Sequence, residues 1–144
     1  MRKLLFIVFL LPFQHLAAQE SEIKHSIEIF FDGFHSRDSL KIKSVCDAGM
    51  VLQSISENSK GTKLSNEKAS EFIKSIVSIP DEMKFEERLL SYKIQVDGAM
   101  AHVWTPYEFY VNGKLSHKGV NSFQLFKEKE TWKIIYIVDT RRKG

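Results

Sequence analysis

A single cysteine, Cys46, occurs in the 144 residues of the chain. One cysteine cannot form a disulfide within the chain, so the packing of hydrophobic residues has to hold the fold together. Hydrophobic residues make up 43% of the sequence, which is enough for one packed core. No motif around Cys46 resembles that of a cysteine nucleophile, and a small buried cysteine is the commoner case. We therefore expect Cys46 to be structural.

Several motifs that bind phosphates, metals or acyl groups are absent from the sequence. It contains neither G-x-x-x-x-G-K-[ST] nor G-x-G-x-x-G, the loops that hold nucleotide phosphates. It also lacks G-x-S-x-G, the turn that carries the nucleophile of many hydrolases. The histidines show no paired spacing such as H-x-x-x-H, and one cysteine gives no thiolate cluster. The sequence therefore predicts no metal and no cofactor.

The chain has little excess charge of either sign. Its formal net charge is +3, and without Arg2 and Lys3 it carries 19 basic and 18 acidic residues, a net charge of +1. The only basic cluster, 141–143, holds three charges. Binding to a nucleic-acid backbone relies on a clustered basic surface, so nucleic acid is not an expected partner.

Long apolar runs are also missing after residue 13. The N-terminal segment has a basic start at Met1-Arg2-Lys3, an apolar run from Leu4 to Phe13 and small residues at Ala17 and Ala18. This order is typical of a signal peptide, and the run is shorter than the ~20 residues that span a bilayer. We predict a signal peptide over residues 1–18, a single domain over residues 19–144, and a secreted or periplasmic location without a membrane anchor. An uncleaved anchor is the alternative.

The first half of the chain shows the spacing of amphipathic helices. Apolar residues between 22 and 34 recur every three or four positions, which predicts a helix. Asp38 or Ser39 can cap a short second helix that ends at Val45. A third helix is expected from about Glu67 until shortly before Pro80. A strand over 48–56 and a polar loop over 58–62 separate the second helix from the third.

The second half alternates with the period of β-strands. Strands are predicted over 90–96, 99–111, 115–127 and 132–140. Asp97-Gly98 and Asn112-Gly113 are strong signals for two-residue hairpin turns. Helices followed by long antiparallel strands predict an α+β domain with one curved meander.

The turns also predict which residues pair. A turn at Asp97-Gly98 pairs Val96 with Ala99 and places both on the core face. A strict two-residue turn at Asn112-Gly113 would put the apolar residues of 115–127 on the opposite face. A bulged turn at Gly113, or a bulge at Pro106, which has no ladder donor, would restore agreement. We expect a bend near Pro106.

The segments 103–110 (VWTPYEFY), 112–113 (NG), 117–123 (HKGVNSF), 132–134 (WKI) and 139–142 (DTRR) carry a family likeness. Together with the order of helices, hairpins and closing strand, the chain resembles the nuclear transport factor two-like superfamily. In particular it is similar to small exported Bacteroidetes-type members that are described as lumazine-binding, polyketide-cyclase-like or SnoaL-like. The resemblance implies a cone-shaped antiparallel sheet (a cystatin-like roll) wrapped over N-terminal helices, with a pocket between them. It implies no single function, because the fold serves several enzymes and non-enzymes.

One strand is expected to carry polar groups into the cone. Its alternate positions are His117, Gly119, Asn121, Phe123 and Leu125, and the last two are too apolar to face water. That face must therefore point inward. The inward polar groups of His117 and Asn121 then need partners. Gly119, which lies between them and has no side chain, leaves room for a ligand or a neighbouring backbone.

Three hypotheses about function follow. The first is a binding module for a small, partly apolar molecule. Its expected ligand-binding residues are Tyr92, Trp104, Tyr107, His117, Asn121, Asp139 and Arg141. The second is an enzyme of isomerase, dehydratase or cyclase type, in which His117 and Asp139 act as acid and base and Tyr107 donates to an oxyanion. The third is a structural or assembly module, in which Asp139 and Arg141 form a structural ion pair.

An aromatic stripe suggests self-association. His102, Trp104 and Tyr110 are at alternate positions of one strand and would form a stripe on the outer face of the sheet, if no bulge intervenes. Trp and Tyr are enriched at interfaces, so a homodimer through this face is predicted. In the alternative, Trp104 is turned into the pocket by the bend at Pro106.

Overall fold

The computed structural model describes residues 11–144, with side chains from residue 16 onward. The predicted signal peptide, residues 1–18, lies largely outside this range, and its cleavage stays a prediction. Within residues 11–144 there are three helices: α1 (Leu11–Ser36), α2 (Ser39–Val45) and α3 (Ala69–Val77). The Asp38 carboxylate accepts hydrogen bonds from the backbone N–H groups of Leu40 and Lys41, so it caps α2 as predicted. Among the described residues, no helix is long and apolar enough to cross a membrane.

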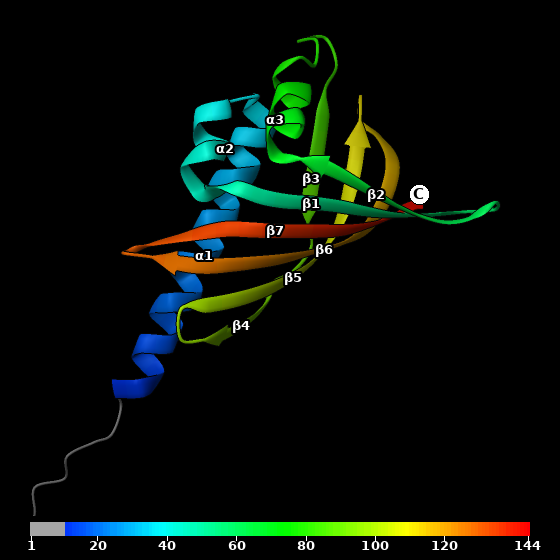
Figure 1. Cartoon of the computed structure of the whole chain (residues 1–144). Helices are drawn as coiled ribbons and strands as arrows, with labels where there is room; N and C mark the ends of the chain where they lie inside the picture. Colours follow the sequence, from blue (N-terminus) through cyan, green and yellow to red (C-terminus); the bar gives the residue numbers. More distant parts are fainter. Residues whose placement is uncertain (1–10) are drawn as a thin grey trace, which may run out of the picture.

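Seven strands form one sheet that curves over the helices (Figure 1). They are β1 (Cys46–Asn58), β2 (Gly61–Lys68), β3 (Phe85–Leu89), β4 (Lys93–Asp97), β5 (Met100–Val111), β6 (Lys114–Glu128) and β7 (Thr131–Lys143). Their order is β2-β1-β7-β6-β5-β3, and β4 also pairs with β5. The predicted α+β class and curved sheet are confirmed. The sheet is not a pure meander, because β1 runs parallel to β7 while the other pairs are antiparallel.

Two strands were not predicted. β2 replaces the expected loop and the start of the third helix, which begins only at Ala69. All eight β2 residues are exposed, so this edge strand has no apolar alternation to reveal it. In β3, Phe85 and Leu89 point inward on either side of Glu87, and the charge at the middle position hid the period of two.

The first hairpin has a shifted register. Its turn consists of Gly98 and Ala99 rather than Asp97 and Gly98, so Val96 pairs with Ala101 instead of Ala99. Gly98 has a φ of 58°, a conformation that glycine adopts without strain. Because the pairing moves by two residues, the paired side chains stay on their predicted faces, whereas Ala99, expected on the core face, is exposed in the turn.

The second hairpin corrects the expectation for Pro106. Asn112 and Gly113 form a strict two-residue turn with φ values of 48° and 75°. One extra residue on β6, Ser116, allows the apolar residues of β5 and β6 to share the same face of the sheet. Pro106 pairs with Val120 in an unbroken register, so there is no bulge at the proline.

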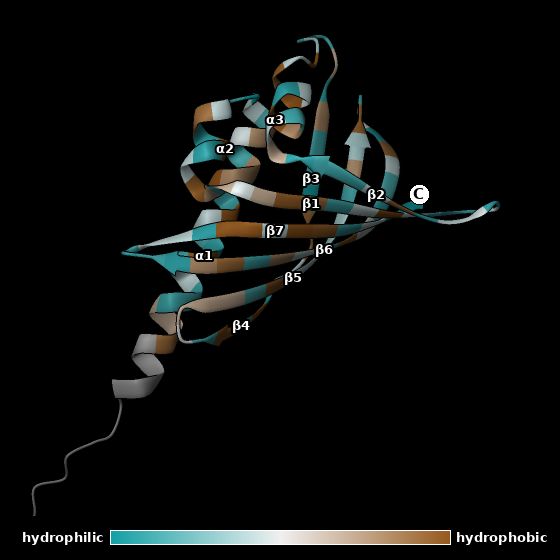
Figure 2. Cartoon of the chain, in the orientation of Figure 1, coloured by the Kyte–Doolittle hydropathy of each residue, from teal (hydrophilic) through white to brown (hydrophobic). Residues whose placement is uncertain are grey.

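The core lies between α1 and the concave face of the sheet. Figure 2 shows hydrophobic residues along the middle of β1 and β7, whereas β2 is hydrophilic. The side chains that are 0% exposed include Ile23 and Ile27 from α1, and Val103, Phe123 and Leu125 from the sheet. The core therefore fills one end of the cone and leaves the other end to the groups described next.

Candidate functional site

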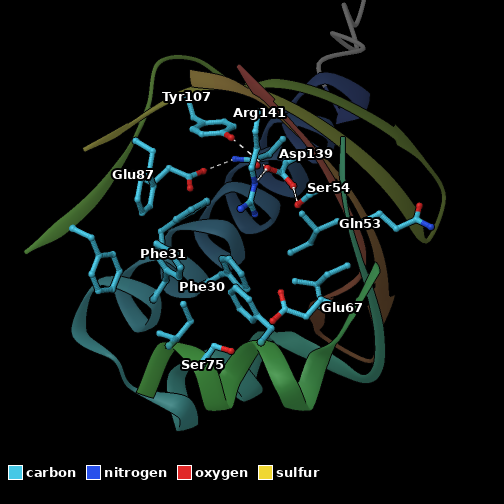
Figure 3. A pocket seen from close by; sticks show the side chains of 18 of the residues that line it. Phe30, Phe31, Gln53, Ser54, Glu67, Ser75, Glu87, Tyr107, Asp139 and Arg141 are labelled. Atoms are coloured by element: carbon cyan, nitrogen blue, oxygen red, sulfur yellow. Dashed lines mark hydrogen bonds and ion pairs between the residues drawn. The ribbon is translucent and has the colours of Figure 1, made fainter. Parts of the chain in front are cut away.

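A cavity of about 350 Å³ opens inside the curved sheet. The sheet forms one side of it, and α1 and α3 form the other (Figure 3). Glu67 from β2 and Ser75 from α3 line the side opposite Tyr107, and both are exposed, so the cavity opens to solvent there.

One wall of the cavity is made of phenylalanine rings. These are Phe30, Phe31, Phe34, Phe72, Phe85, Phe109 and Phe123. The rings hold one another: Phe34 meets Phe85 at 5.1 Å between centroids, and Phe85 stacks on Phe109 at 6.3 Å. Such mutual packing fixes the rings, so the wall is rigid and apolar.

Asp139 is the centre of a polar cluster on the sheet. It is 8% exposed and accepts hydrogen bonds from Ser54 on Oδ1 and, on Oδ2, from Tyr107 at 3.2 Å and from Arg141 Nε at 2.7 Å. Both carboxylate oxygens are therefore occupied by donors of the chain. The terminal nitrogens of Arg141 make no hydrogen bond with any residue the structure describes, and the half-exposed guanidinium points into the cavity (Figure 3).

Glu87 contributes a second carboxyl group to the cavity. Its Oε1 accepts a hydrogen bond of 2.6 Å from the Asn121 amide, and its backbone N–H donates to His35 Nε2 at 2.9 Å. Its Oε2 has no hydrogen-bond partner within residues 16–144. Burial raises the pKa of Glu87 to about 7, the Asn121 hydrogen bond opposes this, and the nearby Asp139 adds to it.

His117 lies in the same cavity but apart from Asp139. Its ring stacks on Phe109 at 4.7 Å and meets Tyr107 edge-on at 5.9 Å. Burial lowers its pKa, and the positive charge of Arg141 lowers it further. No hydrogen bond joins the His117 ring to Asp139 in the described chain. On the sheet, Asp139 pairs with Asn121. Asn121 is four residues from His117 along β6, which is about 13 Å of backbone. The two side chains are therefore not hydrogen-bonded to each other, although both line the cavity, and a joint acid–base role stays a prediction.

Tyr107 is held on the sheet by two acceptors. Its hydroxyl lies 2.9 Å from the Thr140 carbonyl oxygen and 3.2 Å from Asp139 Oδ2. Burial raises the pKa of this phenol, and the negative charge of Asp139 raises it further. The group therefore stays protonated and acts as a hydrogen-bond donor.

The structure brings together five of the seven residues that the sequence suggested for the site. Tyr107, His117, Asn121, Asp139 and Arg141 all line the cavity.

Tyr92 and Trp104 do not line it. Trp104 is at an even position of β5 between the buried Val103 and Thr105, so it faces the convex side of the sheet, where it is 43% exposed. The bulge at Pro106 that could have turned it inward is absent, because the pairing of β5 with β6 is regular there. Tyr92 packs against the core, with Lys24 Nζ 5.1 Å from its ring centroid.

Several cavity residues were missed from the sequence. Glu87 had a usable signal, since it lies between Phe85 and Leu89 at a spacing of two and so had to share their inward face. Ser54 and Glu67 had none, because their strands show no clear alternation. In the described part of the chain, no three metal-binding side chains come together.

Known proteins resemble this chain in structure rather than in sequence. No family model matches the sequence, and no curated protein matches it. Solved structures do match it in shape. An NTF2-like protein from Cytophaga hutchinsonii has a TM-score of 0.70 at 12% identity, over 86% of this chain and 98% of that one. An NTF2-like protein from Streptomyces avermitilis with a proposed dehydratase activity has a TM-score of 0.67 at 14% identity, over 89% and 99%.

A third match is the β subunit of a proposed aromatic-ring-hydroxylating dioxygenase from Novosphingobium aromaticivorans. It has a TM-score of 0.71 at 8% identity, over 90% of this chain and 92% of that one. At such low identity these likenesses show the fold alone. The chain therefore has the nuclear transport factor two-like (NTF2-like) fold.

Proposed function

We propose that the protein binds a small, partly apolar molecule inside the cone. The observation that carries this proposal is a cavity that has a wall of phenylalanine rings and a cluster of polar groups facing it. Ligand sites in proteins are commonly of this kind: concave, mostly apolar, with a few placed polar groups. A volume of about 350 Å³ is near the lower end for such sites, so a molecule of one or two rings is expected.

Binding inside the cone can be tested with a probe and a blocking substitution. The neutral probe 3-ethylindole is expected to bind wild-type protein, measured by calorimetry. Ser75→Trp places an indole into the cavity from α3 and should abolish this binding. Ser70→Trp is the matched control, because Ser70 is also exposed on α3 but does not line the cavity. Equal binding by both variants would show that the probe binds elsewhere, and a probe that does not bind wild type would count against the proposal.

The natural ligand can be sought directly. Native mass spectrometry on protein purified from its own host should show a bound molecule that Ser75→Trp lacks. The predicted export places this ligand outside the cytoplasm. Fusing residues 1–18 to a reporter enzyme that is active only after export tests that prediction.

An enzyme that moves a proton is the second candidate, favoured by Glu87. Its Oε2 borders the cavity, and a carboxyl with a pKa of about 7 can both accept and donate a proton near neutral pH. In such a reaction Glu87 would break a C–H bond beside a ketone and take the proton, leaving an enolate. The test is exchange of the α-protons of 2-tetralone in D₂O, followed by NMR. Wild type should accelerate the exchange and Glu87→Gln should not; equal rates would exclude this role.

A further inference from the structure

The charges inside the cavity are unbalanced. Glu67, Glu87 and Asp139 supply three carboxyl groups, whereas Arg141 supplies the one guanidinium among the residues that line the cavity. Arg141 Nε is already bound to Asp139 at 2.7 Å, so these two charges largely offset each other. The remaining carboxyl groups leave an excess of negative charge when they are ionised.

Among the carboxyl groups of the cavity, that of Glu67 is exposed to solvent, whereas that of Glu87 is partly buried and has an open acceptor. One oxygen is bound to Asn121, and the other has no partner among the described side chains. The residue is half-buried because part of its side chain borders the cavity. Figure 3 shows Glu87 reaching toward the cavity from the edge of the sheet. A carboxylate in this position favours a ligand that brings a donor and a positive charge.

The aromatic wall accounts for the apolar part of the ligand. Phe85 is two residues before Glu87 on the same face of β3, and it contacts Phe34 and Phe109. The faces of Phe85 and Phe109 are already covered, because the two rings stack on each other and also lie against Arg37 and His117, respectively. The carboxylate of Glu87 would therefore stabilise a cation, while the rings pack against the apolar body of the ligand.

We propose that the ligand is an amine with a one- or two-ring apolar body, whose ammonium group binds the open oxygen of Glu87 while the body lies among the phenylalanine rings. This inference rests on the proposed binding function and adds the chemical class of the ligand to it.

Binding of the amine depends on the ionisation of Glu87. The groups that face this carboxyl are Asn121 and His117 from β6, Asp139 and Arg141 from β7, and Tyr107 from β5, with His35 of α1 bound to its backbone. Burial lowers the pKa values of both histidines, which favours their neutral forms. An alkylammonium remains charged up to about pH 10. Over pH 6 to 8 the main change is therefore the loss of the proton from Glu87.

Three probes with one ring system test the inference: tryptamine, indole-3-propionate and 3-ethylindole. At pH 8, tryptamine should bind wild-type protein at least ~10-fold more tightly than the other two. Its affinity should fall by roughly tenfold at pH 6, where most Glu87 is protonated, while that of 3-ethylindole stays constant. Glu87→Gln should remove both the preference for tryptamine and its pH dependence.

The matched control is Glu86→Gln, the neighbouring carboxyl on the opposite face of β3, which is exposed and paired with Arg88 at 2.8 Å. It should keep the preference. If indole-3-propionate binds most tightly, Arg141 selects the ligand and the inference is wrong. Equal affinities for all three probes would also overturn it, while leaving the proposed binding function intact. Binding of none of them would contradict both.

Discussion

The hydroxyl of Tyr107 lies 2.9 Å from the carbonyl oxygen of Thr140, and it crosses Gly119 to reach it. Tyr107 and Gly119 are directly paired between β5 and β6, and Thr140 is on the next strand, β7. A Cβ atom at position 119 would stand 1.7 Å from the same carbonyl oxygen. The absence of a side chain at Gly119 therefore makes room for neighbouring backbone.

Gly119→Ala should therefore destabilise the sheet beside the site. The new methyl group forces β6 and β7 apart, because a backbone atom is what it meets. Overpacking of this kind costs about 3 kcal/mol of unfolding free energy. Urea denaturation measures the loss. Gly49→Ala is the control: its Cβ would lie 3.2 Å from the Asp47 side chain, which can move, so its cost should stay below about 1 kcal/mol.

The stability of the protein should fall as the pH rises through the titration range of Glu87. Its pKa is about 7 in the folded state against 4.5 for an unperturbed glutamate, so between these values the folded state binds more protons than the unfolded state. Unfolding free energy then decreases with rising pH, by roughly 3 kcal/mol for this group between pH 4.5 and 7.

Glu87→Gln isolates that contribution, because glutamine has the shape of the protonated acid. At pH 5 the variant and wild type should be about equally stable, and at pH 8 the variant should be more stable by about 2–3 kcal/mol. Chemical denaturation at both pH values measures the difference. Glu86→Gln, on the exposed face, should show no such divergence. A constant gap between Glu87→Gln and wild type at all pH values would show that Glu87 does not titrate in this range.

Site residues could be predicted from the sequence where apolar residues on the same strand showed which of its faces points into the core. Phe123 and Leu125 fixed the inward face of β6 and so placed His117 and Asn121 correctly. The same logic applied to Phe85 and Leu89 would have found Glu87, but β3 was too short and too charged to be recognised as a strand.

Other features depend on tertiary pairing that the sequence does not display. β2 is polar at every position and is a strand only because it pairs with β1. The parallel pairing of β1 with β7 joins segments about 85 residues apart, and it brings Ser54 to Asp139. Trp104 was misplaced because the extra residue that sets the faces of the second hairpin is Ser116, not one near Pro106.

Cys46 should react slowly while the protein is folded. Burial raises the pKa of its thiol to about 12, so the reactive thiolate is rare at pH 8. Compared with the unfolded chain, the rate of labelling by iodoacetamide should fall by about 100-fold or more. The measurement compares labelling in buffer and in urea. Equal rates would show that the thiol is not protected and would reopen a functional role for it.

Asn121→Leu and Phe123→Ala should separate binding from folding on β6. The Phe123 ring is 0% exposed and meets Phe30 and Phe31 at 6.2 and 6.1 Å, so its removal leaves a hole and costs about 3–4 kcal/mol of unfolding free energy. Asn121 instead donates one hydrogen bond to Glu87, across the cavity edge. Leucine fills a similar volume but cannot donate, so at pH 5, where Glu87 is protonated, the loss should be only about 1 kcal/mol.

The cost of Asn121→Leu should grow with pH, because an ionised Glu87 loses a charge-assisted hydrogen bond, a loss of about 2 kcal/mol at pH 8. The cost of Phe123→Ala should not change, since the buried ring packs against the uncharged rings of Phe30 and Phe31. Denaturation of both variants at pH 5 and pH 8 gives the four values needed. If Asn121→Leu destabilises the protein as much as Phe123→Ala at pH 5, Asn121 belongs to the structural core, and its assignment to the binding site fails. If instead its cost is small at pH 5 and rises at pH 8, the amide serves mainly to hold the Glu87 carboxylate in place for a ligand.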